Sequence, residues 1–187
     1  MHTKHGLYLS PDGKKFSTRN GKTIKLEEVL DEAGQKAGNE AVGVGAIKYY
    51  DLLHGVASNI VFDWDKILSL EGNSGPYLQY AYARSRSVLA KSKSNYELRI
   101  MDYELNNEEL SILRWIYRYP EVVVEAAKRF APNLLCNFLY ELAQRFNSFY
   151  NQCPILENNF RLKLTAVVGD TLRDGLNILG ITAPDKM

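Results

Sequence analysis

The sequence is poor in cysteine and has no long apolar run. Its two cysteines, Cys136 and Cys153, do not form a C-x-x-C pair, so neither a disulfide framework nor a zinc site is expected. No apolar stretch approaches the roughly 20 residues that a membrane helix needs, and the N-terminus lacks the apolar core of a signal peptide. These absences predict a protein of the reducing cytoplasm that does not enter a membrane.

Side chains of the familiar catalytic sites are also scarce. Of the three histidines, His2 and His5 form an H-x-x-H pattern without an evident carboxylate partner, so no metal site is predicted there. No G-x-S-x-G motif occurs, and neither cysteine has a histidine near it in the sequence, which leaves no signature of nucleophilic catalysis. The sequence therefore contains no self-sufficient active site.

The letters GKT at residues 21–23 resemble the end of a phosphate-binding P-loop. That motif is G-x-x-x-x-G-K-S/T, because consecutive backbone N–H groups must wrap around a phosphate. The first glycine would have to stand at position 16, which holds Phe16, and Gly13 lies too far away. The spacing excludes a P-loop, and the segment needs another explanation.

Charge is segregated along the chain although the net charge is only +1. Six cations and a single acid, Asp12, occur in residues 1–25, and a second basic stretch spans residues 84–99. An acidic block runs between them, from Glu27 to Glu71. Such runs often form an ordinary solvated surface, but they also allow local contact with a polyanion.

Helical periodicity dominates the pattern. A short strand is predicted over residues 5–10, and helices are predicted over residues 26–37 and 42–53. An irregular connection follows up to about residue 75, with glycine and asparagine as breakers. From there on the apolar spacing is helical, and the helix starts are marked by Pro76, by an Asn106/Glu109 capping pair, and by Pro120 and Pro132. We predict a mainly α protein, with a helical bundle from about residue 74 onward.

A basic, glycine-bounded loop is the clearest candidate for chemistry. It carries Lys14, Lys15, Ser17, Thr18 and Arg19. Cations and hydroxyl groups in this arrangement suit a triphosphate, since they meet the negative charge that develops on it. A solvated basic turn is the alternative interpretation of the same residues.

Four blocks of sequence resemble arginyl-tRNA synthetases, a class I family. Residues 15–19, KFSTR, resemble the K-M-S-K-S signature in the K-M/F-S-T-R form of that family, with Phe16 in place of methionine. Residues 5–33 resemble its strand, loop and following helix. Residues 61–88, 134–156 and 172–187 resemble its DALR-type anticodon-binding domain, so the resemblance covers nearly the whole chain.

The resemblance implies two parts. Residues 1–73 would be the C-terminal edge of the catalytic domain, with a short strand, the loop and two helices, and residues 74–187 would be the α-helical anticodon-binding domain. The H-x-G-H signature of the family is absent. We therefore expect a C-terminal portion of the enzyme that is inactive without the N-terminal catalytic half.

The resemblance also implies roles for the loop residues. The full enzyme would attach arginine to its tRNA with ATP, accompanied by Mg²⁺, as substrate. Lys15 and Arg19 would be the catalytic cations on the ATP phosphates, and Ser17 and Thr18 would bind the same phosphates as hydroxyl donors. No cofactor is expected to bind tightly to this chain alone.

The helical part carries candidates for reading RNA. Sequence-specific recognition usually stacks splayed bases on aromatic rings and reads their edges by hydrogen bonds. The chosen residues are Tyr77, Tyr80, Arg84, Asn147, Phe149 and Met187, from a set of candidates that also includes Phe146, Tyr150, Asp185 and Lys186. Phe146 and also Tyr77 fall on apolar stripes typical of a core. Basic residues would hold phosphates without reading sequence: Arg84, Arg86, Lys91 and Lys93.

The expected partners are arginine tRNAs and the missing catalytic domain, and a monomer is expected. One alternative is a stand-alone tRNA-binding module without catalysis, which could also bind a partner synthetase. A cysteinyl-type synthetase is a further alternative, disfavoured by residues 71–84 and 179–187. A purely structural interaction bundle is the remaining one.

Overall fold

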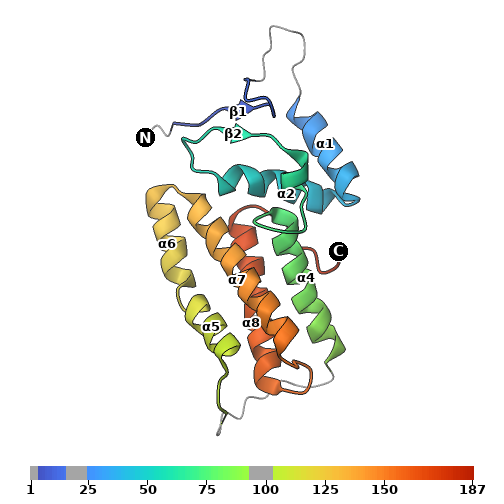
Figure 1. The fold of residues 1–187 in the computed structure, drawn as a ribbon, viewed down its shortest axis with the longest axis vertical. Helices are drawn as coiled ribbons and strands as arrows, with labels where there is room; N and C mark the ends of the chain where they lie inside the picture. Colours follow the sequence, from blue (N-terminus) through green and yellow to red (C-terminus); the bar gives the residue numbers. More distant parts are fainter. Residues whose placement is uncertain (1–3, 16–24, 93–102) are drawn as a thin grey trace.

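The computed structural model describes residues 4–15, 25–92 and 103–187, and helices make up most of it (Figure 1). This confirms the predicted mainly α fold. In chain order the elements are β1 (Tyr8–Leu9), α1 (Leu26–Ala37), α2 (Glu40–Leu53), β2 (Ile60–Val61), α3 (Trp64–Ile67), α4 (Gly75–Lys91), α5 (Asn107–Ile116), α6 (Tyr119–Arg129), α7 (Pro132–Gln152) and α8 (Asn159–Ile178).

Local sequence signals set the helix ends. Gly38 ends α1 in the left-handed conformation, with φ 66°, which a residue without Cβ adopts at little cost. The Ser74 side chain caps α4 by accepting from the backbone N–H of Tyr77. Asn106 and Glu109 form the predicted reciprocal capping box at the start of α5. These ends agree with the sequence-based boundaries.

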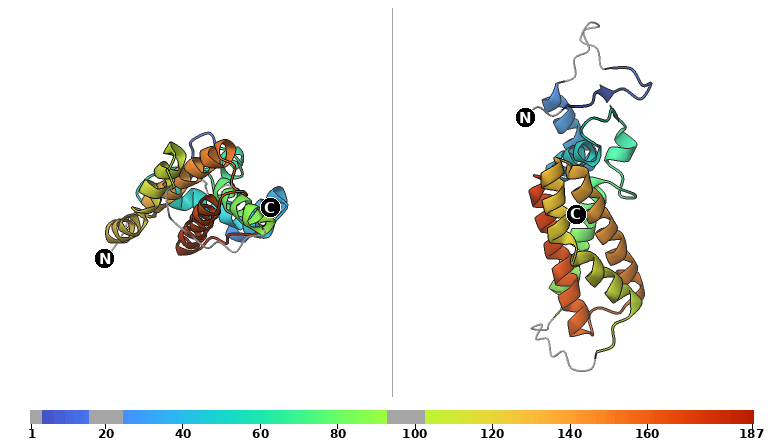
Figure 2. Two further views of the ribbon diagram at one scale, coloured as in Figure 1. Left: turned by 90° about the horizontal axis from the view of Figure 1, so that it is seen from below. Right: turned by 90° about the vertical axis from the view of Figure 1, so that its left-hand side faces the viewer.

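Helices α4 to α8 form the bundle, and α7 runs through its middle (Figures 1 and 2). The apolar stripe of α7 is the centre of the core, because Leu139, Leu142 and Phe146 have 0% exposure. Helix α7 packs against α5, α6, α8, α4 and α2. The helix therefore has a stripe of buried residues and leaves only a narrow surface for function.

Helix α2 lies across one end of the bundle, and α1 packs on it (Figure 1). The buried Tyr49 ties α2 to α7, since its hydroxyl lies 2.6 Å from Asn73 Oδ1 and 2.9 Å from the Cys136 carbonyl oxygen. A Cβ on Gly43 would come within 2.3 Å of the Ala33 carbonyl carbon. Only glycine allows α1 and α2 to approach so closely.

Strands β1 and β2 form a two-stranded parallel pair that aligns Tyr8 with Ile60 and Leu9 with Val61. Sequence analysis predicted β1 but treated residues 61–75 as an irregular connection. The structure instead places β2 and the short helix α3 there, with the Asp63 side chain capping α3. No helix within the described residues is both long and apolar enough to span a bilayer.

Candidate nucleic-acid interface

The predicted phosphate loop begins at the edge of the β1 strand. Lys15 is exposed and pairs with Leu9 in an isolated antiparallel bridge. Gly13 adopts φ 75° in the turn between them, and Lys14 Nζ lies 3.2 Å from Asp12 Oδ2. The other predicted phosphate ligands, Ser17, Thr18 and Arg19, lie outside the described residues.

One face of α4 brings three of the predicted RNA-reading residues together. Tyr77, Tyr80 and Arg84 share this face at spacings of three and four residues. Arg84 Nη1 donates to Asn147 Oδ1 on α7 at 2.8 Å, and Asn147 Nδ2 donates to the Tyr77 hydroxyl at 2.8 Å. Arg84 Nη2 also donates to the Tyr80 hydroxyl at 3.1 Å. The four residues thus form one hydrogen-bonded chain across α4 and α7.

Arg84 is also held between two aromatic rings. Its guanidinium carbon lies 4.7 Å from the centroid of Tyr80 and 4.8 Å from that of Tyr150, within the range of a cation–π contact. Both tyrosines are 39% exposed. The surface here therefore presents aromatic rings around a planar cation, and we call Tyr80, Arg84 and Tyr150 the aromatic stack.

Tyr150 was a candidate from the sequence that was not chosen as a site residue, and the choice of Phe149 as an RNA-reading residue is wrong. Phe149 has 0% exposure because it continues the stripe that contains Phe146, so its ring cannot face a base. Phe146 is buried as predicted. Tyr150 stands one residue beyond the stripe and three after Asn147, and this offset favours it over Phe149 as the surface residue.

The hydroxyl group of Tyr77 faces the site, and its ring faces the interior. The ring is half-buried against the core and lies 5.6 Å from the ring of Tyr140. The hydroxyl accepts the hydrogen bond from Asn147. Tyr77 therefore positions Asn147 and does not provide a stacking surface.

The C-terminal segment, which comprises residues 180–187, runs along a second face of α4. The Tyr82 hydroxyl donates to Asp185 Oδ1 at 2.8 Å, and Arg86 Nε lies 3.4 Å from the same oxygen. Burial and the bond to Asp185 raise the pKa of Tyr82. Met187 is 48% exposed at the end of this segment, so its thioether can contact a ligand.

Besides Arg84, two of the predicted phosphate-binding cations are described. Arg86 is exposed and already paired with Asp185, which reduces the charge that it offers to a phosphate. Lys91 is exposed at the last position of α4, whereas Lys93 lies outside the described residues. Lys91 is the freer of the two to contact a nucleic-acid backbone.

Neither cysteine has the environment of a nucleophile. Burial raises the pKa of Cys136 to about 12, so its thiol stays neutral, and Cys153 is buried too. In residues 4–15, 25–92 and 103–187, no group of three or more histidine, cysteine, aspartate or glutamate side chains is placed to hold a metal ion.

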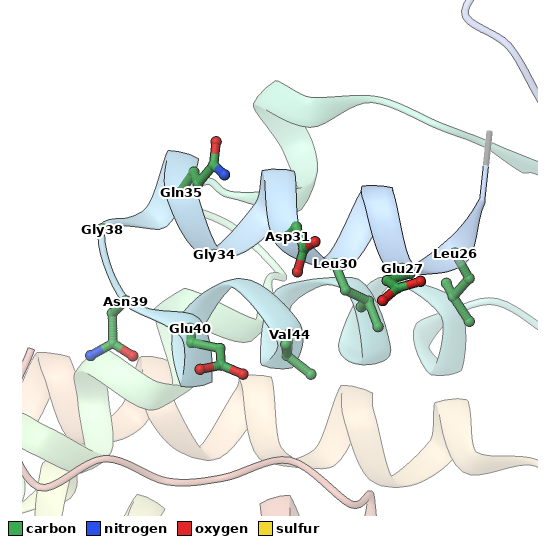
Figure 3. Close-up of a pocket in the computed structure, with 10 residues that line it drawn as sticks. All are labelled: Leu26, Glu27, Leu30, Asp31, Gly34, Gln35, Gly38, Asn39, Glu40 and Val44. Atoms are coloured by element: carbon green, nitrogen blue, oxygen red, sulfur yellow. The ribbon is translucent and has the colours of Figure 1, made fainter.

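A groove of about 850 Å³ lies between α1 and α2 (Figure 3). Its apolar lining includes Leu26, Leu30 and Val44, and Figure 3 shows Glu27 and Glu40 beside them. Carboxylates around an apolar floor repel a polyanion. The groove is therefore not part of a nucleic-acid interface, and the aromatic stack on α4 and α7 is the stronger candidate.

Two known families match separate parts of the chain. Residues 78–187 match the family described as DALR anticodon binding domain. Residues 1–41 match the family described as tRNA synthetases class I (R), catalytic domain. The aromatic stack and the C-terminal segment thus lie inside the first match, and β1 and α1 lie inside the second.

Proteins that are similar in sequence are named arginine–tRNA ligase. The chain is 41% identical to the arginine–tRNA ligase of Pasteurella multocida, over all of this chain and 38% of that protein. It is 40% identical to the arginine–tRNA ligase of Histophilus somni, over all of this chain and 37% of that protein. The chain thus spans well under half the length of these relatives.

Solved structures show the same arrangement of helices. Thermus thermophilus arginyl-tRNA synthetase superposes with a TM-score of 0.88 at 28% identity, over 98% of this chain and 35% of that one. The Plasmodium falciparum arginyl-tRNA synthetase gives a TM-score of 0.84 over 100% and 35% of the two chains, at 23% identity. The second likeness concerns the fold alone.

Proposed function

The chain belongs to the DALR anticodon binding domain family, and from this premise we propose that residues 74–187 bind the anticodon region of an arginine tRNA. The observation that carries the proposal is the aromatic stack of Tyr80, Arg84 and Tyr150. It lies within the matched segment and is partly exposed on α4 and α7. Arginine as the amino acid follows from the names of the relatives.

The stack can receive an unpaired base. A tyrosine ring or a guanidinium plane supports a base by stacking, which contributes about 1–3 kcal/mol per base. Arg84 has five N–H donors, and its bonds to Asn147 and Tyr80 engage one hydrogen on each terminal nitrogen. The second hydrogen on each nitrogen can then meet a base edge or a phosphate.

Met187 and the basic residues would complete this interface. Met187 would pack its apolar, adaptable side chain against one side of the base. Lys91 at the end of α4 would add a contact to phosphate, which strengthens binding without reading sequence. The residues that would contact a base and the residue that would contact a phosphate are thus different, although α4 carries members of both sets.

We propose further that this chain acts as the C-terminal portion of an arginine–tRNA ligase. Lys15, Ser17, Thr18 and Arg19 would bind the phosphates of ATP, accompanied by Mg²⁺, while arginine is activated and transferred to tRNA. The support is the match of residues 1–41 to the class I catalytic family and the relatives' names. The enzyme would act as a monomer in the cytoplasm, with the N-terminal catalytic domain as the other half of the active site.

The loop assignment has its own test. In the longer enzyme, Lys15→Ala removes one cation from the leaving pyrophosphate, and such a loss typically costs about 3–4 kcal/mol of transition-state stabilisation. We expect the ATP–pyrophosphate exchange rate to fall by about two to three orders of magnitude while tRNA affinity is unchanged. An exchange rate equal to that of the wild type would remove Lys15 from the phosphate site.

A stand-alone tRNA-binding module is the alternative function. It is favoured by the observation that the aromatic stack needs no residue of the catalytic match. The two functions differ in one measurement, because only the first predicts that the chain restores aminoacylation when it is combined with the N-terminal half of a related ligase.

Binding of tRNA is the primary experiment. An arginine tRNA transcript is compared with one in which the central anticodon base is changed, across a series of salt concentrations. We expect the change to weaken binding at least tenfold, or about 1.4 kcal/mol, at every salt concentration. If both transcripts bind equally and weaken together as salt rises, only backbone charge is recognised, and the anticodon proposal fails.

A further inference from the structure

The C-terminal segment, residues 180–187, is attached to the rest of the molecule by four polar side chains, one of which is Arg86 with its ion pair to Asp185. Lys48 Nζ on α2 donates to the Gly180 carbonyl oxygen at 2.7 Å. Gln79 Nε2 on α4 donates to the Thr182 carbonyl oxygen at 2.7 Å, and the Tyr82 hydroxyl donates to Asp185. Ile181 is 2% exposed and anchors the segment in the core. The backbone that carries Met187 is therefore fixed along most of its length.

Gln79 differs from the other three because it is fully buried and bridges two segments. Its Nε2 donates to the Ala41 carbonyl oxygen in the first turn of α2, at 3.2 Å, as well as to Thr182. Both amide hydrogens are thus used. Ala41 is the last residue of the catalytic-family match, whereas Thr182 belongs to the anticodon-domain match.

The orientation of the Gln79 amide is determined by its surroundings. Its Oε1 atom is buried without a hydrogen-bond partner among the described residues. Turning the amide over would place this oxygen against two carbonyl oxygens and would remove the donor that each of them receives from Gln79. A buried polar atom without a partner is unfavourable, so the bridge to Ala41 and Thr182 is what favours glutamine over an apolar residue here.

The sequence of α2 leaves room for this bridge. Gly45 faces the Gln79 amide, and a Cβ at this position would lie 2.7 Å from Nε2 and 3.1 Å from Ile181 Cγ2. Any larger residue would therefore displace the amide, the C-terminal segment or both. Gly45, Gln79 and Thr182 form one packed unit between α2, α4 and the tail.

Two opposite faces of α4 carry these two sets of contacts. Tyr77, Tyr80 and Arg84 point toward α7, whereas Gln79, Tyr82 and Arg86, at the same spacing, hold the C-terminal segment. Because one rigid helix supports both sets, the position of the tail relative to the aromatic stack is set by the contacts of the second face.

We propose that Gln79 is a positioning residue for anticodon recognition, which fixes residues 180–187 against α2 and α4 so that Met187 takes a defined place beside the bound base. This inference rests on the proposed function. Gln79 does not touch the tRNA and acts through the tail. Its loss should therefore weaken discrimination between anticodons more than it weakens binding to the tRNA backbone.

The test replaces Gln79 by methionine, which keeps the length of the side chain and removes both donors. We expect Gln79→Met to keep the helical circular dichroism spectrum and to reduce the preference for the correct anticodon from at least tenfold to below threefold. The affinity for the altered transcript and its salt dependence should not change. In the same variant, carboxypeptidase should remove Met187 at least fivefold faster than in the wild type.

Two further variants keep the test decisive. Lys48→Met removes an exposed donor to the same segment and should have a smaller effect in the same direction, which decides the question if Gln79→Met does not fold. Gln35→Met, at an exposed position of α1, is the matched control and should resemble the wild type in every measurement.

The outcomes separate the two proposals. If the wild type discriminates between anticodons and Gln79→Met discriminates equally well, the positioning role is overturned and anticodon binding stands. The same conclusion follows if discrimination falls but the tail is digested at the wild-type rate, since the effect would then not pass through the tail. If the wild type does not discriminate at all, anticodon binding fails first and the inference falls with it.

Discussion

Glu109 is a fully buried carboxylate, and its charge is compensated from several sides. Arg161 Nε lies 2.7 Å from Oε1, the Asn106 backbone N–H donates to Oε2 at 2.8 Å, and the Tyr103 hydroxyl donates to Oε1. Burial alone would raise the pKa of Glu109, but the bonds from Tyr103, Asn106 and Arg161 outweigh it and lower the pKa below its ordinary value. The carboxylate is thus stabilised in its ionised form.

Replacing Glu109 by glutamine should destabilise the bundle. Removing one partner of a buried ion pair leaves the other charge uncompensated, and this costs about 3–5 kcal/mol. We expect a loss of that size in the free energy of unfolding of Glu109→Gln at pH 7, measured by urea denaturation. Glu157→Gln, at an exposed position, is the control and should unfold like the wild type.

The lowered pKa of Glu109 also predicts how the destabilisation by Glu109→Gln depends on pH. Because the pKa of Glu109 is lower in the folded state, its contribution is fully present above the unfolded pKa of about 4.3 and is lost as the pH falls through the folded value. The difference in unfolding free energy between wild type and Glu109→Gln should therefore be constant from pH 7 to pH 5 and shrink at lower pH. A difference that grows on acidification would contradict the assignment.

At the scale of single elements, α7 separates adjacent residues into core and surface. Phe149 is buried, whereas Tyr150 is 39% exposed and packs on Arg84. A step of one residue turns the side chain by about 100° around the helix axis, which is enough to move it out of the stripe. The two aromatic residues should therefore respond to substitution in opposite ways.

Tyr150→Ala should weaken binding of the arginine tRNA without unfolding the protein. One stacked base contributes about 1–3 kcal/mol, so we expect the Kd to rise about 5- to 150-fold, measured by fluorescence anisotropy. Tyr117→Ala removes a ring that is 88% exposed between α5 and α6, away from the stack, and should leave the Kd unchanged. Equal effects of both substitutions would point to non-specific contacts.

The helices could largely be predicted from the sequence because their signals are local. Gly38, the Asn106/Glu109 pair and the prolines mark ends through contacts within a few residues. Strand β2 could not be predicted in this way, since Ile60 and Val61 become a strand only by pairing with β1, about fifty residues earlier. The aromatic stack was predicted in part, because i, i+4 spacing identifies Tyr80 and Arg84, whereas Phe149 was chosen on α7 in place of the candidate Tyr150.

Phe149 shows how two sequence signals can conflict. Its position on the α7 stripe predicts a core residue, whereas the polar Asn147-Ser148 step before it suggested a surface. The stripe decided the outcome, because the apolar face of α7 must be buried for the bundle to form. For a long central helix, periodicity is therefore a better guide than the polarity of adjacent residues.

At the scale of the whole molecule, α1 and α2 form a layer across the end of the bundle (Figures 1 and 2). Helix α2 is joined to the bundle through Tyr49 and Gln79. Helix α1, which follows the predicted phosphate loop, packs chiefly on α2. The contact between α1 and α2 thus links the C-terminal side of the loop to the bundle, while β1 links its N-terminal side through β2 and through the bond from Tyr8 to Asp51 on α2.

Gly43→Ala should break this link while leaving the bundle folded. The added Cβ would lie 2.3 Å from the Ala33 carbonyl carbon and 2.4 Å from the Gly34 nitrogen, so α1 has to move away from α2. Gly34→Ala is the matched control on the other side of the interface, because its Cβ would make ordinary contact with Glu40 Cα at 3.4 Å. It should stabilise α1 by up to about 1 kcal/mol through helix propensity.

Hydrogen exchange distinguishes these two substitutions. In Gly43→Ala, amide exchange in α1 should accelerate at least tenfold, whereas the amides in the middle of α7 should keep their wild-type rates, because α1 unfolds at a lower free energy than the core. In Gly34→Ala, exchange in α1 should slow. If α7 accelerates together with α1 in Gly43→Ala, the layer and the bundle unfold as one unit. Movements of α1 would then be coupled directly to the aromatic stack, and residues 1–73 could not be treated as a separate part.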